Sequence, residues 1–257
     1  MMSIRIEHEA GIHTVVMDRP EKKNAFTLDM YRAFGEAFNA LDADDSVRCI
    51  VLRGAGATFC AGSDIGGFDS GRSNIEQARQ YARFTLDMTD TLKNTRHPTV
   101  ACIEGACVGG GLEIAMHCDV RIAARSARFG FPINRIGLCV DHEELADLIG
   151  VVGHTVALET LLQGHIFGAD EALLKGFVTR LADDASVVDD AYQIATRIAN
   201  GAPLVNRWHK KFVRRLRSSE PLTGTERDEA YLCFDTQDYR SGTQAFARKE
   251  RPVFDGK

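Results

Sequence analysis

Short apolar runs in the first half of the chain alternate with amphipathic stretches, and the two patterns predict different elements. Apolar or alternating runs predict strands at 4–8, 12–17, 47–52, 99–103 and 120–124. Apolar residues at steps of three and four predict helices at 27–41 and 74–96, the first capped by Thr27. Strands that alternate with helices in this way are typical of an α/β fold.

Helical patterns dominate the second half of the chain. We expect helices at 142–149, 154–162, 169–175, 186–200, 203–217 and 223–239, interrupted by one short strand near 177–181. The sequence therefore predicts an α/β core that is followed by an α-helical C-terminal part.

The composition is that of an ordinary globular protein, and it argues against several classes. The 257 residues carry a net charge of −5, which disfavours a general nucleic-acid-binding protein. The first residues lack an apolar signal core, and the sequence shows no apolar run of membrane-spanning length. Seven cysteines without a CxxC pair fit a reducing compartment. We therefore expect a cytoplasmic protein with neither a membrane nor a nucleic acid as its partner.

The segment 98–119 combines a buried strand with three consecutive glycines that lead into a helix. Glycines at a helix start leave the first amides uncovered, so the N–H groups around Gly109 and Gly110 can point at an anion. Glu113 follows in the first turn, which places a carboxylate base beside these donors. Each feature also has a structural explanation, because glycine-rich turns are common and the helix dipole favours an acid in the first turn.

A second glycine-rich stretch, 53–67, follows the strand at 47–52. Its start nearly matches a dinucleotide-binding fingerprint, but Phe59 occupies the position of the third glycine, so we reject that interpretation. Residues 60–67 form another glycine-rich turn. Two such turns, each after a core strand, are more informative together than either is alone.

Several motifs taken together resemble the enoyl-CoA hydratase/isomerase (crotonase) family. They are NA at 24–25, CAGSDI at 60–65, GACVGGGLEIA at 105–115, CD at 118–119 and FG at 129–130, with further similarity at 162–164, 169–176 and 246–249. The resemblance implies an α/β fold, a crotonase-like spiral of ββα turns with a C-terminal α-helical trimerisation region. Residues 1–200 would form the core with the active site, and residues 201–257 would serve oligomerisation and CoA contact in a homotrimer or a dimer of trimers.

The resemblance also implies an acyl-CoA thioester substrate, with coenzyme A as part of the substrate and no separate cofactor or metal. The thioester carbonyl would lie between the backbone amides of Ser63 and Gly110, where fixed donors stabilise an enolate oxygen without reorganisation. The positions that match substrate-binding segments are Lys22, Asn24, Ala25, Ala61, Asp64, Ile65, Gly109, Ile133, Phe246 and Lys249. Lys22 and Lys249 would approach the CoA phosphates, whereas Asp64 is better explained as a helix cap than as a catalyst.

The sequence departs from the hydratase pattern at Ile133. That position usually carries the second of two glutamates, and isoleucine cannot move a proton, a loss expected to cost roughly 10²–10⁴-fold in rate. Asp141 falls where dienoyl-CoA isomerases and aryl-CoA dehalogenases of this family carry a catalytic aspartate, so Glu113 and Asp141 are a candidate carboxylate pair. Asp141 and Glu144 equally fit a capping box for the helix that follows.

Three hypotheses therefore stay open. The first is hydration of a 2-enoyl-CoA, with Glu113 as acid and base and with Ser63 and Gly110 as the oxyanion hole. The second is double-bond isomerisation or other acyl-CoA chemistry that uses Asp141. The third is a CoA-binding protein with little catalysis, which the missing glutamate at Ile133 keeps open.

The acyl group is not identified by the sequence. Phe68, Phe129 and Phe131 suggest an apolar acyl pocket, although aromatic residues in an α/β core more often serve packing. Residues 117–119 have no further ligand at metal-binding spacing, so we expect no metal site.

Overall fold

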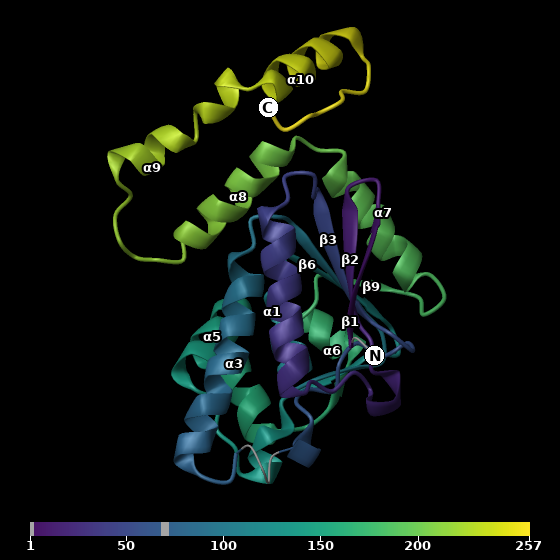
Figure 1. Ribbon diagram of the computed structural model, residues 1–257, viewed down its shortest axis with the longest axis vertical. Helices are drawn as coiled ribbons and strands as arrows, with labels where there is room; N and C mark the ends of the chain where they lie inside the picture. Colours follow the sequence, from purple (N-terminus) through teal and green to yellow (C-terminus); the bar gives the residue numbers. More distant parts are fainter. Residues whose placement is uncertain (1–2, 68–71) are drawn as a thin grey trace.

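The computed structural model describes residues 3–67 and 72–257. Its centre is a six-stranded sheet in the spatial order β1–β2–β3–β4–β6–β9 (Figure 1). The strands are β1 (Ile4–Glu9), β2 (Ile12–Met17), β3 (Cys49–Gly54), β4 (Thr99–Ile103), β6 (Val120–Ala124) and β9 (Arg180–Ala182). β1 and β2 form an antiparallel hairpin, and the other neighbouring pairs are parallel. The predicted α/β class is confirmed.

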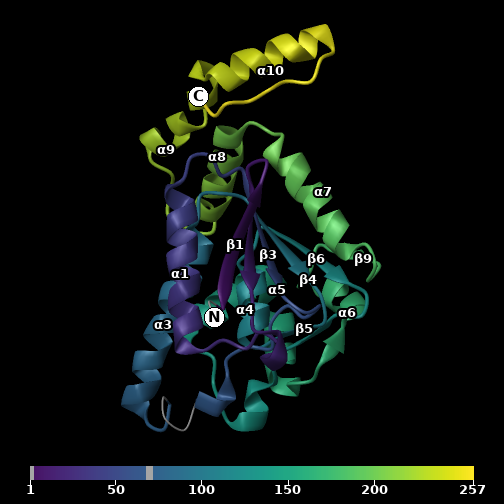
Figure 2. The same ribbon diagram turned by 45° about the vertical axis from the view of Figure 1, so that its right-hand side comes forward.

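Both faces of this sheet are covered, which is why its inner strands are continuous apolar runs. The covering helices are α1 (Leu28–Ala43) and α3 (Ile75–Asn94) on one side and α7 (Val187–Ala199) on the other (Figure 2). Alternate residues of β3 point in opposite directions, so Ile50 and Leu52 lie in the larger core with α1, whereas Cys49 and Val51 pack with α7. As predicted, Thr27 caps α1 by accepting a hydrogen bond from the Met30 amide at 3.3 Å.

A second, three-stranded sheet is not evident from the sequence. It consists of β5 (Ala106–Val108), β7 (Arg128–Gly130) and β8 (Phe167–Gly168). Strands of two or three residues are too short to show an alternating pattern. A single bridge joins Cys60 to Cys107 of β5, and another joins Phe26 to Ser63. These bridges hold the glycine-rich turn at 60–65 beside the start of α4 (Gly110–Met116).

Helix α5 (His142–Gln163) takes the place of the two helices predicted at 142–149 and 154–162. It kinks at Gly153, whose φ of 77° and ψ of 164° are not helical, and the kink explains the break in the apolar pattern. Contrary to the sequence-based expectation, α5 is long and apolar enough to cross a membrane, the one such helix among the described residues. Core helices of soluble proteins pass the same test, so this finding assigns nothing. Helix α6 (Ala169–Leu174) follows it.

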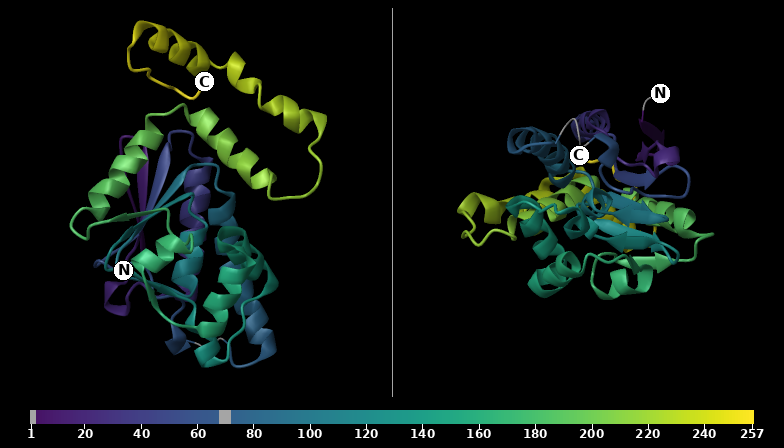
Figure 3. Two further views of the ribbon diagram at one scale, coloured as in Figure 1. Left: turned by 180° about the vertical axis from the view of Figure 1, so that it is seen from behind. Right: turned by 90° about the horizontal axis from the view of Figure 1, so that it is seen from below.

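The C-terminal helices lie beyond one end of the main sheet (Figure 3). They are α8 (Pro203–Arg215), α9 (Gly224–Glu229), the 3₁₀ helix η4 (Leu232–Asp235) and α10 (Gln237–Arg248). The single helix predicted at 223–239 is therefore wrong. Helix α9 stops at Glu229, and Thr236 caps a new helix by accepting a hydrogen bond from the Tyr239 amide at 3.0 Å. The division of the chain at residue 200 stays a prediction.

Candidate active site

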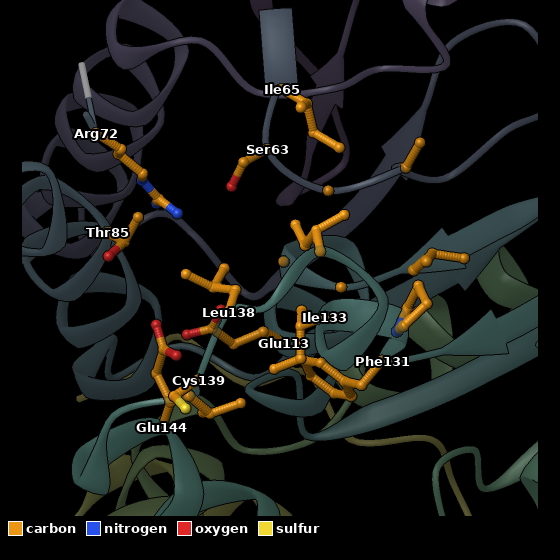
Figure 4. A pocket seen from close by; sticks show the side chains of 18 of the residues that line it. Ser63, Ile65, Arg72, Thr85, Glu113, Phe131, Ile133, Leu138, Cys139 and Glu144 are labelled. Carbon is orange, nitrogen blue, oxygen red and sulfur yellow. The ribbon is translucent and has the colours of Figure 1, made fainter. Parts of the chain in front are cut away.

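A cavity of about 170 Å³ lies between the turn at 60–65, the start of α4 and the start of α5 (Figure 4). Phe131, Ile133 and Leu138 form an apolar wall along the 3₁₀ helix η3 (Pro132–Ile136) and the loop after it. Glu113 and Glu144 form an acidic corner, and we use this name for the two carboxyl groups below. An apolar cavity with a few converging polar groups is typical of a small-molecule site.

Two backbone amides face the same part of the cavity. Ser63 and Gly110 both line it, and a methyl group built on Gly110 would lie 3.8 Å from the Ser63 nitrogen. Neither nitrogen donates to an acceptor among the described residues. The Gly110 amide is the first of α4, where the helix itself offers no partner. An oxygen atom bound between these nitrogens would accept two hydrogen bonds from a fixed backbone.

Glycine is required where the two turns touch. A Cβ atom on Gly111 would lie 2.2 Å from the Cys60 carbonyl oxygen, and one on Gly62 would lie 2.9 Å from the Val108 carbonyl oxygen. Gly62 also has a φ of 99°, which disfavours other residues. The Val108 amide donates to the Cys60 carbonyl oxygen at 3.0 Å and ties the turns together. Backbone packing therefore brings the two amides close together.

The Ser63 side chain has a partner that the sequence does not reveal. Its hydroxyl lies 2.8 Å from the hydroxyl of Tyr31, a residue of α1 that is 3% exposed. Burial raises the pKa of the Tyr31 phenol well above its usual value, so the phenol keeps its proton. Nothing in the sequence separates Tyr31 from the apolar residues on the same helix face. The hydrogen bond fixes the turn that carries the Ser63 amide.

The carboxyl groups of the two glutamates in the acidic corner point toward each other (Figure 4). Burial, and then the charges of Glu144 and Asp141, raise the pKa of Glu113 well above its usual value. Burial, and then the charge of Asp141, raise the pKa of Glu144 from 4.5 to about 7. Carboxyl groups this close cannot both ionise easily, so ionisation of one opposes ionisation of the other.

One oxygen of the pair is available to a ligand. Oε1 of Glu113 is buried and has no hydrogen-bond partner among the described residues. Buried polar atoms are nearly always paired, so an unpaired one needs an explanation. Because Glu113 lines the cavity, a bound molecule could supply the missing partner.

Asp141 is the N-cap of α5. Its Oδ1 accepts hydrogen bonds from the amides of Glu143 at 3.0 Å and Glu144 at 2.9 Å, which confirms the capping interpretation. Unlike Glu144, it does not line the described cavity. Its catalytic role stays a prediction, and the residue that the structure brings to Glu113 is Glu144. The sequence analysis treated Glu144 only as a capping partner, although its place in the first turn after Ile133 was a usable indication.

Arg72 is the third charged residue on the cavity wall. Its guanidinium carbon lies 3.4 Å from the centroid of the Tyr81 ring, and its charge lowers the pKa of both Glu113 and Glu144. It lies in a loosely patterned segment before α3, and no sequence motif marked it.

The predicted substrate-binding residues divide into two groups. Ala61, Ile65, Gly109 and Ile133 line the cavity. The remaining residues do not line it. Lys22, for example, is exposed on the surface in the 3₁₀ helix η1 (Pro20–Lys22).

Asn24, Ala25 and Asp64 act on the turn through hydrogen bonds. The amide nitrogen of the buried Asn24 side chain donates to the carbonyl oxygens of Ala55 and Thr58 at 2.9 and 2.6 Å. The Asp64 carboxylate accepts from Arg19 at 2.7 Å, and Arg19 also donates to the Ala25 carbonyl at 3.0 Å. These contacts stabilise the turn, and the predicted contacts of all three residues with a substrate stay predictions.

Phe246 and Lys249 belong to the end of α10 and are exposed. Helix α10 lies beyond one end of the sheet (Figure 1), and neither residue lines the cavity. Within one chain, therefore, these residues are not brought to the cavity. Their contact with CoA and the trimer stay predictions.

The phenylalanines predicted for an acyl pocket lie in different places. Phe131 lines the cavity, Phe129 packs 6.1 Å from the ring of Phe167 in the core, and Phe68 lies outside the described residues. Among residues 3–67 and 72–257, no three His, Cys, Asp or Glu side chains cluster as a metal ion would require.

Comparison with known proteins agrees with this geometry. The family model described as enoyl-CoA hydratase/isomerase matches residues 7–257. An enoyl-CoA hydratase of Alternaria alternata is 33% identical over 95% of this chain and 83% of its own length. The 1,2-epoxyphenylacetyl-CoA isomerase of Escherichia coli is 30% identical over the full length of both chains.

Solved structures show the same fold. The crystal structure of an enoyl-CoA hydratase/carnithine racemase from Magnetospirillum magneticum superposes with a TM-score of 0.98 at 44% identity, over 100% of this chain and 97% of the other. An enoyl-CoA hydratase from Bacillus anthracis gives a TM-score of 0.93 at 25% identity over both full chains. The predicted crotonase-like fold is confirmed, and the chain belongs to the enoyl-CoA hydratase/isomerase family.

Proposed function

We propose that this protein hydrates 2-enoyl-CoA thioesters with the acidic corner, Glu113 and Glu144, as its proton-transfer groups. The observation that carries the proposal is that these two half-buried carboxyl groups point toward each other in a cavity whose wall also presents two amides without an acceptor among the described residues. A pair of carboxyl groups with raised pKa values supplies an acid and a base at one pH.

The amides of Ser63 and Gly110 would bind the thioester carbonyl oxygen. As water adds to C3, negative charge moves to this oxygen, and two fixed N–H donors stabilise it there. One such donor is typically worth about 3 kcal/mol in the transition state. The Tyr31–Ser63 hydrogen bond at 2.8 Å and the close glycine packing hold the donors in place, so little reorganisation is needed.

The proton balance of the reaction suits a pair in direct contact. Glu144, as carboxylate, takes a proton from water while the water oxygen bonds to C3 and the C2–C3 electron pair moves to the thioester. Glu113, as acid, gives its proton to C2 as the enolate collapses to the 3-hydroxyacyl thioester. The proton on Glu144 then passes to the neighbouring carboxylate of Glu113, which restores the starting state.

In this scheme Glu144 replaces the glutamate that is missing at Ile133. Both residues line the cavity, but they approach it from different elements, Ile133 from η3 and Glu144 from α5. The substitution therefore removes one carboxylate from the wall, and the first turn of α5 supplies another.

A second candidate is migration of the acyl double bond. The same two carboxyl groups could move a proton from C2 to C4 of a 3-enoyl thioester without a water molecule, and the apolar Ile133 leaves one polar partner fewer for such a water. A full-length relative is named a 1,2-epoxyphenylacetyl-CoA isomerase, so isomerisation of an acyl-CoA occurs among the relatives of this chain, although that name refers to an epoxide and not to a double bond.

The test is an assay of purified protein with short and medium 2-enoyl-CoA and 3-enoyl-CoA substrates. We expect hydration to fall by roughly 10²–10⁴-fold in Glu113→Gln and in Glu144→Gln, because each amide keeps the shape but cannot exchange a proton. Glu143→Gln is the matched control, since Glu143 lies beside Glu144 and is exposed. It should match the wild type.

Each alternative gives a different result. Turnover of 3-enoyl-CoA without hydration would replace the first candidate by the second. Hydration that survives in Glu144→Gln but not in Glu113→Gln would remove Glu144 from the chemistry. Wild-type protein that binds acyl-CoA without turning over either substrate would leave a binding protein.

A further inference from the structure

We propose that Arg72 is a positioning residue whose guanidinium keeps one negative charge on the acidic corner and so preserves the base of the reaction. The inference rests on the proposed function only for its catalytic consequence. Its electrostatic part concerns the free protein and is measurable without a substrate.

An aromatic wall holds the guanidinium in place. Its central carbon lies 3.4 Å from the Tyr81 ring centroid, a stacked cation–π geometry, and Tyr81 is 7% exposed. The Tyr81 ring meets the Tyr31 ring edge-on at 5.9 Å, and Tyr31 is bonded to Ser63. Arg72 is thereby tied to the same wall that carries one of the oxyanion donors.

The guanidinium extends into the cavity near Ser63 and Thr85, and the carboxyl groups of Glu113 and Glu144 lie below it in the view of Figure 4, beyond Leu138. An arginine in this place keeps its positive charge at every pH of interest. Its field favours the state in which one of the two carboxyl groups is ionised, and it opposes the burial and repulsion that favour full protonation.

The other charged groups around the pair do not supply this cation. Asp141 and Asp147, both at the start of α5, are acidic and disfavour ionisation of the corner. Lys93 and Arg217 approach α5 too, but they contact the Asp147 carboxylate, at 2.7 and 3.3 Å, and balance that charge.

The remaining titratable groups near the pair are neutral around pH 7. Burial lowers the pKa of His117 on α4 to about 4, and burial raises the pKa of the Tyr31 phenol well above its usual value. Among the residues that the structure describes, Arg72 is thus the cation on the cavity wall that acts on both glutamates.

Removing the cation should convert the corner into a doubly protonated pair over a wider pH range. The acid Glu113 would survive this change, but the base would be lost until the pH is raised. The activity of the variant should therefore fall at neutral pH and return at higher pH, whereas a merely structural defect would lower activity at every pH.

The experiment compares Arg72→Met and Arg72→Gln with the wild type by carbon-13 NMR titration of the glutamate carboxyl groups in the full-length free protein. Glu113→Gln and Glu144→Gln assign the two resonances. We expect the titration of the pair to move upward by roughly one pH unit, the size of losing a unit charge several ångströms away at an effective dielectric near 20. The acidic limb of the kcat/KM profile should move equally, with about a tenfold loss at neutral pH.

Two further variants complete the design. Arg83→Met removes an exposed arginine from α3 and should change neither the carboxyl titration nor the pH profile of kcat/KM. Arg72→Lys keeps the charge without the planar stack, so its shift should be smaller than that of Arg72→Met. Because two neutral variants are used, a failure of one to fold leaves the comparison intact.

A titration that does not move in a folded neutral variant would overturn the inference, as would an equal loss of activity at all pH values. These results differ from a failure of the proposed function. If the titration moves but the wild type turns over no acyl-CoA, the electrostatic role stands and the proposed reaction is wrong.

Discussion

The two sides of the cavity are built in different ways. On one side, the turn at 60–65 and the start of α4 are made by backbone contact, and the residues behind them, Cys60 and Cys107, are completely buried. On the other side, the loop after η3 exposes Ile136 by 54% and Leu138 by 38%, and α5 begins there with acidic side chains.

This difference between a backbone-built and a side-chain-built wall indicates which site residues can be replaced during evolution. Amides are supplied by every residue type, but only glycine allows the two backbones to come this close, so the first side depends on a few small residues. The second side presents side chains on a solvent-facing loop and helix start. A proton-transfer group can move there from one element to another, which is how Glu144 can stand in for a glutamate at Ile133 without disturbing the fold.

The most damaging change should be on the backbone side, at Gly111. In Gly111→Ala the new methyl group would lie 2.2 Å from the Cys60 carbonyl oxygen, so one of the two backbones must shift. We expect unfolding free energy to fall by about 3 kcal/mol or more, measured by urea denaturation.

Gly109→Ala is the matched control for that change. Nothing lies within 4 Å of a Cβ atom there, although φ is 55°, so only the left-handed backbone should cost energy, about 1–2 kcal/mol. Equal losses in both variants would show that contact between the turns is not what demands glycine.

The same contrast explains how much the sequence predicts. The hairpin, the inner strands, α1 and the glycine turns follow from local patterns that persist over five or more residues. Ser63, Gly110 and Glu113 could be proposed because they belong to those turns. The small sheet of β5, β7 and β8 could not, because its pairing joins segments of two or three residues that are far apart in sequence.

The side-chain half of the site is harder to predict for a geometric reason. Asp141 and Glu144 are three positions apart in the sequence. Which of them approaches Glu113 depends on which face of the first turn of α5 meets α4. Periodicity does not fix that face, because α5 is apolar over most of its length. Arg72 and Tyr31 reach the cavity only through the packing of α3 on α1, which no local pattern encodes.

The second prediction concerns the pH dependence of stability on the α5 side. Because the pKa of Glu144 is raised from 4.5 to about 7, its contribution favours the folded state below pH 4.5 and is lost as the pH rises through 7. Glu144→Gln should therefore be more stable than the wild type at pH 8 by about 1–3 kcal/mol, discounted for partial exposure, and should gain nothing at pH 5.

Two histidines also change the stability of the protein with pH, but they affect the wild type and Glu144→Gln equally. Burial lowers the pKa of both His97 and His117 to about 4, so their contribution is lost as the pH falls from 6.5 through 4, in the wild type and the variant alike. Thermal denaturation at both pH values measures the difference. If Glu144→Gln were less stable than the wild type at pH 8, the contacts of the Glu144 side chain would outweigh the cost of its buried charge.

The smallest effect should come from Asp141, and it separates the two roles considered for this residue. Asp141→Ala removes the acceptor for the amides of Glu143 and Glu144 and should cost about 1 kcal/mol of stability. Asp141→Asn keeps an acceptor oxygen and should cost less. Both variants remove a charge that raises the pKa of Glu144, so the acidic limb of the rate profile should move to lower pH while the maximal rate is retained.

A loss of maximal rate in Asp141→Asn, with stability intact, would instead make Asp141 part of the chemistry. Asp141 would then act in the reaction together with Glu144. Its carboxylate would have to exchange its two amide partners for a substrate during turnover. Because those hydrogen bonds are 3.0 and 2.9 Å long and hold the first turn of the helix, such an exchange should loosen the turn that positions Glu144. Hydrogen exchange at the Glu143 and Glu144 amides, measured with and without a bound acyl-CoA, distinguishes a fixed cap from one that opens.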